Sequence, residues 1–273
     1  MADEILTSEA GEGSLVFEQE DSPTTVGGLR AFEMFFRGIR EIDTGAITFF
    51  QSKTRLNTPK LGTIPSESFR EVAELSKQCI SVFELELAQA VEAIQKFTAR
   101  DFFFRWLSVY LPPMFLLERM AEQKMMSYIE DAGIDSNRIC FELPLKLLTE
   151  GNARHAKVIG NLRNRGFHFM LTGFGGTNCP LMKLSEFPVD YVMLSKEITS
   201  YIGKSDRSNA AVHSIVDFVD GLGADTIADG IVNSSQAEIL FQNNCHYVAG
   251  PLSGKYTSER YVRKKNDEIL EKE

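Results

Sequence analysis

The feature that most constrains this chain is the alternation of short apolar runs with stretches of helical period from residue 102 onward. Alternating strands and helices are typical of an α/β fold whose strands lie parallel. The strands that this pattern predicts cover residues 102–110, 138–143, 168–172, 191–194, 226–228 and 247–249. The helices that it predicts between the first of these strands cover residues 114–131 and 146–165.

The chain opens with a different pattern. Residues 32–39 and 46–51 are two apolar runs, and the turn sequence Asp-Thr-Gly at 43–45 separates them. Two strands that are joined by a tight turn must be antiparallel. The first two strands are therefore expected to form a hairpin, unlike the later parallel strands.

Two helices are expected between the hairpin and the alternating region. Ser66 follows Pro65 and precedes the run FREVAEL, which predicts a helix with Ser66 as its N-cap. An apolar stripe of helical period predicts the second helix at about residues 80–98. Eight strands with helices between the later ones predict an α/β fold, a modified TIM-type (βα)8 barrel with an antiparallel first strand.

The charge balance limits the classes of partner. Against 38 acidic residues the chain has 29 basic ones, for a formal net charge of −9. Nucleic-acid binding depends on clustered Lys and Arg, so no nucleic-acid partner is expected. The longest uncharged apolar run, residues 106–117, is too short to cross a bilayer, and the first residues lack a secretory pattern. The sequence therefore predicts no membrane partner and a cytoplasmic location.

Composition divides the chain into three parts. Residues 1–28 contain seven acidic residues and no Lys or Arg, which predicts an acidic flexible arm. Residues 29–258 carry the strand and helix patterns and are expected to form the barrel. Residues 259–273 are dense in charge, which predicts a charged C-terminal helix or tail.

Six groups of short segments carry more information together than alone. They are FFRGI (35–39) with DTG (43–45), TIPSESF (63–69), LRNRGF (162–167), GFGG (173–176), FPVDYV (187–192) and ADGI (228–231). In this order they resemble the EAL domain, a phosphodiesterase module that opens the bacterial second messenger cyclic di-GMP. The resemblance runs from Arg30 to about Tyr256 and implies the same barrel.

The resemblance also implies a site with two divalent metal ions, which bind the phosphate and activate the attacking water. At the family's functional positions, however, this sequence carries other residues. They are Gln51, Tyr110, Thr172, Gly173, Met193, Ser195, Val232 and Ala249. Acidic residues remain at Glu142 and Asp229. Since two divalent cations need several converging carboxylates, the sequence predicts a degenerate domain with no metal, no cofactor and no catalytic residue, and thus not an enzyme.

A non-catalytic receptor for cyclic di-GMP is the first alternative. By the same resemblance, Arg55 stands at an arginine position that contacts the ligand, and Arg37 lies at the barrel mouth. Lys53 replaces an apolar contact residue. These three cations could neutralise two phosphates, but the other nucleotide contacts of the family are replaced. The sequence therefore disfavours cyclic di-GMP as a ligand.

Residues 106–113, 192–194 and 227–231 are similar to YdiV-type regulators, which are EAL-like proteins that bind a protein instead of the nucleotide. This likeness implies a catalytically inactive, regulatory protein–protein interaction module in motility, biofilm or cyclic di-GMP signalling. Its partner would be a transcriptional or motility regulator, and the sequence leaves a dimer open. A third hypothesis, after the interaction module and the receptor, is an enzyme of unrelated chemistry on the same barrel.

Overall fold

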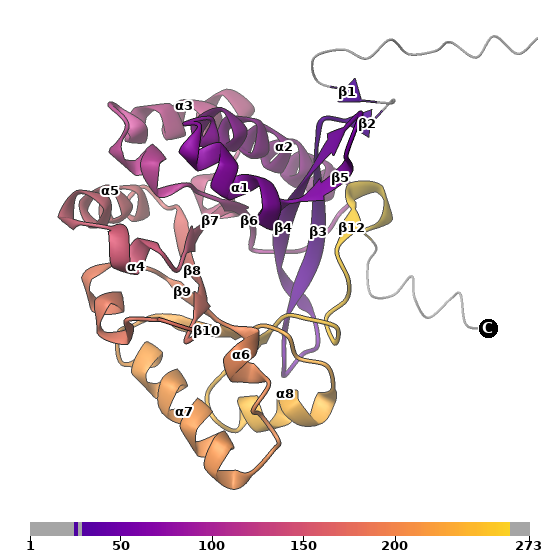
Figure 1. Ribbon diagram of the computed structural model, residues 1–273. Helices are drawn as coiled ribbons and strands as arrows, with labels where there is room; N and C mark the ends of the chain where they lie inside the picture. The colour runs from indigo at the N-terminus through magenta and orange to yellow at the C-terminus, as the bar shows by residue number, and fades with distance from the viewer. Residues whose placement is uncertain (1–24, 27–28, 263–273) are drawn as a thin grey trace, which may run out of the picture.

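The computed structural model describes residues 25–26 and 29–262, and within them an α/β barrel (Figure 1). Eight strands of the described chain close the barrel: β3 (Phe32–Glu41), β4 (Ile47–Thr58), β6 (Trp106–Tyr110), β7 (Ile139–Pro144), β8 (His168–Phe174), β9 (Tyr191–Leu194), β10 (Asp225–Ala228) and β11 (Tyr247–Val248). From β4 through β11 each strand pairs parallel with the next, and β3 pairs antiparallel with both β4 and β11. The predicted modified TIM-type barrel is confirmed.

The hairpin follows the predicted turn. Gly45 adopts a left-handed φ of 64°, and its N–H donates to the carbonyl of Glu41 at 2.9 Å. Gly is the residue that adopts such a φ at least cost. The sequence placed the end of the second strand at residue 51, but β4 continues to Thr58, because β5 (Gly62–Pro65) pairs with its second half. The hairpin therefore extends beyond the barrel wall.

Helices cover the outside of the barrel (Figure 1). The α-helices are α1 (Ser66–Leu75), α2 (Cys79–Ala99), α3 (Ala121–Ala132), α4 (Leu147–Glu150), α5 (Ala153–Arg163), α6 (Lys196–Thr199), α7 (Asp206–Asp220) and α8 (Ser234–Phe241). Short 3₁₀ turns occur at η1 (Pro113–Leu117), η2 (Ser136–Arg138), η3 (Leu181–Glu186) and η4 (Glu259–Tyr261), and strands β1 (Thr25–Val26), β2 (Leu29–Arg30) and β12 (Thr257–Ser258) lie outside the eight. No helix within the described residues is both long enough and apolar enough to cross a bilayer.

Two predicted helices are each divided in two. The helix expected at 114–131 is instead η1 followed by α3, because Met120 has a left-handed φ of 64°. The helix expected at 146–165 breaks before α5, where Asn152 is an N-cap that accepts a hydrogen bond from the Arg154 N–H at 3.0 Å. Single left-handed or extended residues interrupt the helical hydrogen-bond ladder, which the apolar pattern does not reveal.

Two further predictions were wrong at element ends. Ser66 is the first residue of α1 instead of its N-cap, because Pro65 takes the extended cap conformation. The strand expected at 102–110 begins only at Trp106. Phe102 and Phe104 instead pack against Phe97 at the end of α2.

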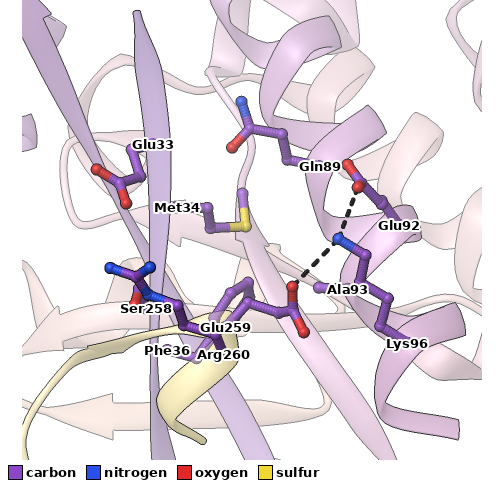
Figure 2. A pocket seen from close by; sticks show the side chains of 10 residues that line it. All are labelled: Glu33, Met34, Phe36, Gln89, Glu92, Ala93, Lys96, Ser258, Glu259 and Arg260. Carbon is purple, nitrogen blue, oxygen red and sulfur yellow. Dashed lines mark hydrogen bonds and ion pairs between the residues drawn. The ribbon is translucent and has the colours of Figure 1, made fainter. Parts of the chain in front are cut away.

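The chain after the barrel returns along its outside as a C-terminal strap, which we define as residues 256–262. Its strand β12 pairs antiparallel with β3, with Thr257 opposite Phe36 and Ser258 opposite Phe35. The strap also lies against α2, and a groove of about 330 Å³ separates the two (Figure 2). The expected arm at 1–28 lies almost wholly outside the described residues, as does most of the expected tail at 259–273.

The barrel interior has an apolar lower layer. Its members are Ile39, Phe49, Trp106, Cys140, Met170, Tyr191, Met193, Ile227, Tyr247 and Ala249. The Phe49 and Trp106 rings are stacked with centroids 4.0 Å apart. Inward-facing side chains nearer the carboxyl ends of the strands point into the mouth of the barrel. Sites form at this end in barrels of this type.

Candidate functional site

A cavity of about 440 Å³ opens at the carboxyl ends of the parallel strands. The residues that line it are Arg37, Gln51, Ser52, Lys53, Ser66, Glu67, Arg70, Tyr110, Glu142, Thr172, Gly173, Met193, Leu194, Ser195, Lys196, Glu197, Asp229 and Tyr256. They come from β3, β4, α1, β6 to β9, α6, the loop after β10 and the C-terminal strap. We call it the mouth cavity.

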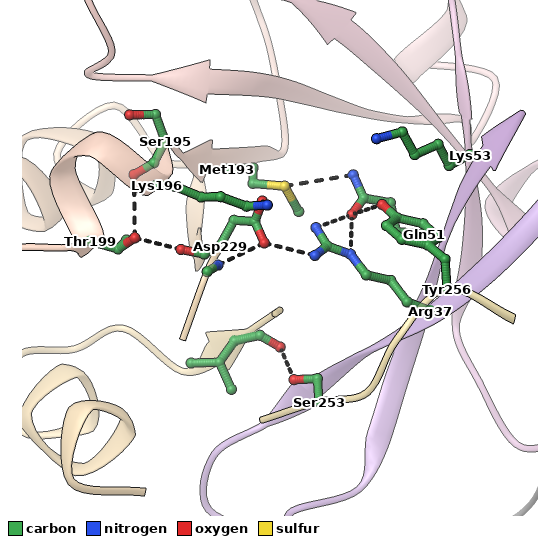
Figure 3. A network of polar contacts seen from close by, with 12 residues as sticks. Arg37, Gln51, Lys53, Met193, Ser195, Lys196, Thr199, Asp229, Ser253 and Tyr256 are labelled. Atoms are coloured by element: carbon green, nitrogen blue, oxygen red, sulfur yellow. Dashed lines mark hydrogen bonds and ion pairs between the residues drawn. The ribbon is translucent and has the colours of Figure 1, made fainter. Parts of the chain in front are cut away.

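Arg37 lies at the floor of the mouth cavity with only 7% of its side chain exposed. Its Nη1 is 2.8 Å from Oδ1 of Asp229, and its Nε and Nη2 donate to Oε1 of Gln51 at 2.8 and 2.5 Å (Figure 3). Burial lowers the pKa of Arg37, but Tyr256 and Asp229 together outweigh it and raise that pKa above its ordinary value. Arg37 is therefore a fixed positive charge in this site.

Glu142 is the second buried charge-bearing group of the floor, with 9% exposed. It accepts a hydrogen bond from the Ser108 hydroxyl. Burial raises the pKa of Glu142, while its hydrogen bonds from Ser108 and Gln51 act in the opposite direction. Gln51 thus joins Glu142 to Arg37, so a continuous polar chain crosses the floor from Ser108 to Asp229.

The rim carries three further ion pairs, of which those of Lys53 and Lys196 are more exposed. Lys53 pairs with Glu67 of α1, and burial, which would raise the pKa of Glu67, is outweighed by this contact, so that pKa falls. Arg70 pairs with the buried Glu86 at 2.8 Å. Lys196 is 70% exposed, and its Nζ lies 3.9 Å from Oδ2 of Asp229. Each of these cations already has a carboxylate partner, so an incoming anion would compete with that partner.

The structure brings most of the predicted site residues together and leaves three apart. Gln51, Tyr110, Glu142, Thr172, Gly173, Met193, Ser195, Asp229, Arg37 and Lys53 all line the mouth cavity. Val232 is outside the lining and 54% exposed, whereas Ala249 is fully buried in the lower layer. Arg55 is also outside the lining, and its guanidinium lies 4.0 Å from the centroid of the Phe35 ring.

Sequence reasoning missed eight residues that line the mouth cavity, among them Arg70, Glu67, Lys196 and Tyr256. Arg70 and Glu67 lie on α1, and a helical period could have placed their shared side toward the barrel. Lys196 follows β9 directly, where strand-end residues collect. Tyr256 had no such signal, because only the pairing of β12 with β3 brings it to the mouth.

The oxygen ligands that the mouth offers to a pair of divalent cations are few and already engaged. Asp229 faces the Arg37 guanidinium, and Gln51 offers an amide oxygen that already accepts from Arg37 and Tyr256. Thr172 donates its hydroxyl to the carbonyl of Leu143 at 3.3 Å. Across residues 25–26 and 29–262, no group of three or more His, Cys, Asp or Glu side chains could hold a metal ion. In this arrangement the residues do not fit two metal ions.

Comparison with known proteins places this geometry in a family. The family model described as the EAL domain matches residues 27–256. The chain belongs to the EAL domain family. It is 22% identical over 215 residues to the cyclic di-GMP phosphodiesterase PdeL of Escherichia coli K12, a match that covers 77% of this chain and 58% of PdeL. The chain therefore spans less than two thirds of this curated relative's length.

Solved EAL structures share the fold. The complex of the PaMucR phosphodiesterase with cyclic di-GMP superposes with a TM-score of 0.75 at 15% identity, over 85% of this chain and 94% of that one. The FimX EAL domain from Pseudomonas aeruginosa, bound to cyclic di-GMP, gives a TM-score of 0.74 at 12% identity, over 84% and 91%. At these identities the likeness establishes the barrel alone.

Two sequence predictions are corrected by these comparisons. The prediction that the chain is not an enzyme is contradicted, because PdeL and PaMucR are both named phosphodiesterases. That prediction counted side-chain carboxylates only, whereas Mg²⁺ is often held by one or two carboxylates together with water and substrate phosphates.

The prediction that disfavoured cyclic di-GMP as a ligand is also wrong, because PaMucR and FimX were both crystallised with it. It gave the replaced nucleotide contacts of the family more weight than the cations that remain. Phosphates are recognised by guanidinium and ammonium groups, and the mouth cavity retains Arg37, Lys53, Arg70 and Lys196. The likeness to YdiV-type regulators stays a prediction.

Proposed function

We propose that this EAL domain binds cyclic di-GMP in the mouth cavity and acts as a regulatory module in cyclic di-GMP signalling in the cytoplasm. The observation that carries the proposal is Arg37, a buried guanidinium at the cavity floor. A buried cation interacts strongly with a phosphate because water screens it little. Lys196, which is mostly exposed beside it, supplies a second positive charge for the same ligand.

Uncharged groups of the cavity support the same ligand. The Ser195 hydroxyl is buried with no hydrogen-bond partner within the described part of the chain, and a ligand oxygen would satisfy it. Gly173 has a left-handed φ of 78° and no side chain, so its backbone is exposed to the mouth cavity. The volume of about 440 Å³ falls in the range of small-molecule sites, roughly 300–1,000 Å³.

Calorimetric titration of the whole chain with cyclic di-GMP tests this proposal. We expect saturable binding, and Arg37→Met should weaken it by about tenfold or more, because one charge-assisted phosphate contact contributes about 1.4 kcal/mol or more. The matched control is Lys183→Ala, since Lys183 is a solvent-exposed lysine of η3 outside the mouth cavity. Its affinity should equal that of the wild type.

The same samples measure chemistry separately from binding. Each is incubated with cyclic di-GMP and Mg²⁺ or Mn²⁺, and the linear dinucleotide is quantified by chromatography. Absence of any heat or thermal shift with cyclic di-GMP would contradict the proposal whatever the turnover. Binding that is unchanged in Arg37→Met would place the ligand elsewhere.

The regulatory part of the proposal rests on α1. Val72 and Leu75 of this helix are 63% and 81% exposed. Glu67 and Arg70 of the same helix line the mouth cavity, so a ligand there contacts the helix directly. Contiguous exposed apolar surface is typical of protein-contact sites, and Val72 and Leu75, three residues apart, are neighbours on the helix surface. We infer that α1 contacts a partner protein.

A substitution on α1 separates the two roles. Leu75→Ser removes exposed apolar surface without touching the mouth cavity, so affinity for cyclic di-GMP should stay unchanged. Proteins retained by immobilised wild-type chain should be lost from the variant, as seen by mass spectrometry. A retained set that is identical for wild type and Leu75→Ser would contradict the role of α1.

A further inference from the structure

The C-terminal strap connects the mouth cavity to the outer surface of α2. Its first residue, Tyr256, lines the mouth cavity. Its middle, β12, pairs with β3, and its end reaches the groove between β3 and α2 (Figure 2). One short segment therefore contacts both the candidate ligand site and a helix on the outside of the barrel.

The outer end of the strap is held by contacts near the surface. The Glu259 carboxylate lies 3.1 Å from Nζ of Lys96 and 3.3 Å from Nη1 of Arg100. Arg100 also donates to the carbonyl of Val262 at 2.6 Å, and the Val262 side chain is buried. Ion pairs with this much exposure contribute little, so the outer end depends mainly on the buried Val262 side chain and on the bonds from Arg100 to the carbonyls of Glu259 and Val262.

The inner end is held by the polar chain of the cavity floor. The Tyr256 hydroxyl donates to Oε1 of Gln51 at 2.9 Å, and the Arg37 guanidinium lies 4.9 Å from the centre of the Tyr256 ring (Figure 3). Oε1 of Gln51 thus accepts three hydrogen bonds, two from Arg37 and one from Tyr256. A carbonyl oxygen has two lone pairs, so the three donors compete for it.

We propose that ligand binding in the mouth cavity releases the C-terminal strap from the outside of the barrel. The Tyr256 ring lies 4.9 Å from the Arg37 guanidinium, and a ligand phosphate that pairs with this guanidinium would displace the ring from the cavity floor. Without that anchor, the remaining contacts hold β12 less well, and the apolar side chains of Met34 and Phe36 beneath the strap become accessible. The ligand identity rests on the proposed function, whereas the coupling between cavity and strap does not.

Hydrogen–deuterium exchange on the whole chain, with and without ligand, tests the coupling between the mouth cavity and the strap. At saturating cyclic di-GMP, amides of residues 257–262 should exchange about threefold faster or more, since local opening governs exchange. Amides of α7, which lies across the barrel, should be unchanged. Ligand binding that leaves exchange in the strap unaltered would overturn the proposal.

Two variants test the coupling without ligand. Tyr256→Phe removes the hydroxyl bond and keeps the ring, and Gln51→Ala removes the acceptor from the other side. Both should accelerate exchange at 257–262 by about threefold or more, because each deletes the same hydrogen bond. Tyr261→Phe is the control within the strap, because Tyr261 is outside the mouth cavity, and it should have no effect.

The two arms separate the proposals. If the wild type fails to bind cyclic di-GMP, the proposed function is wrong, and the ligand-free variants still decide the coupling. If the wild type binds and neither Tyr256→Phe nor Gln51→Ala changes the strap, the coupling is wrong and the binding function stands.

Discussion

Two layers of the same barrel interior differ in how they are stabilised. The lower layer is apolar, with Phe49 stacked on Trp106 and Tyr191 edge-on to both rings. The mouth one step above is a connected polar chain from Asp229 through Arg37 to Gln51. A buried apolar side chain needs no hydrogen-bond partner. A buried polar group lowers stability unless its hydrogen-bond or ion-pair partner is present. Substitutions in the lower layer should therefore mainly change the free energy of unfolding, and substitutions in the mouth should mainly change the affinity for cyclic di-GMP.

Trp106→Ala tests this division with the largest effect. The ring is fully buried between Phe49 and Tyr191, so its loss should lower the free energy of unfolding by about 3–5 kcal/mol. Urea denaturation measures the change. The folded fraction should bind cyclic di-GMP with wild-type affinity, and a large loss of affinity would show that the two layers are not separable.

Arg37→Met should have an intermediate effect on stability. It leaves Asp229 without its closest cation, and Lys196 at 3.9 Å compensates only in part. We expect the free energy of unfolding to fall by about 2 kcal/mol, because a partly buried carboxylate loses its ion pair. Urea denaturation at pH 7 is the measurement. Arg37→Met that is as stable as the wild type would mean that the polar chain contributes nothing to the fold.

Glu142→Gln should act in the opposite direction and depend on pH. Burial raises the pKa of Glu142, so the folded chain favours the protonated form. Stability from this group is therefore present at low pH and is lost as the pH rises through its raised pKa. The variant should gain on the order of 1 kcal/mol over wild type at pH 7. In EDTA-containing buffer, that gain should shrink toward pH 4, and a constant gain would contradict the assignment to Glu142.

Lys196→Ala should have the smallest effect on stability. Its side chain is 70% exposed, so the free energy of unfolding should change by less than about 0.5 kcal/mol. Affinity for cyclic di-GMP should fall by about threefold at low salt, and the difference should vanish at high salt because the exposed charge is screened. A difference that persists at high salt would indicate a direct, dehydrated contact.

The contrast between the apolar lower layer and the polar mouth also explains what the sequence could predict. Apolar runs mark the strands well, so β9 was predicted at its observed ends and the antiparallel β3 followed from the turn at residues 43–45. The ends of helices depend on single residues such as Met120 and Asn152, whose conformations leave no periodic pattern.

The mouth was predicted only in part. Residues at strand ends, such as Glu142 and Asp229, could be placed because their strands could be placed. Tyr256 reaches the mouth through a contact between segments 205 residues apart in sequence, with Gln51. Arg37 and Gln51 are only 14 residues apart, but their pairing depends on the exact register of the hairpin, in which they lie opposite each other. Comparing residue types at aligned positions also misjudged the ligand, because it gave the replaced family contacts more weight than the cations Arg37 and Lys53, which it had identified.

The reversed direction of β3 has a geometric consequence for the way the chain enters the barrel. Because β3 starts at the mouth end, the chain before residue 32 approaches from that end, and the strap beside Phe35 and Phe36 departs near it (Figure 1). A barrel whose strands were all parallel would receive its first strand at the closed floor. Here, the described chain enters its first barrel strand beside the opening, within reach of whatever enters the mouth cavity.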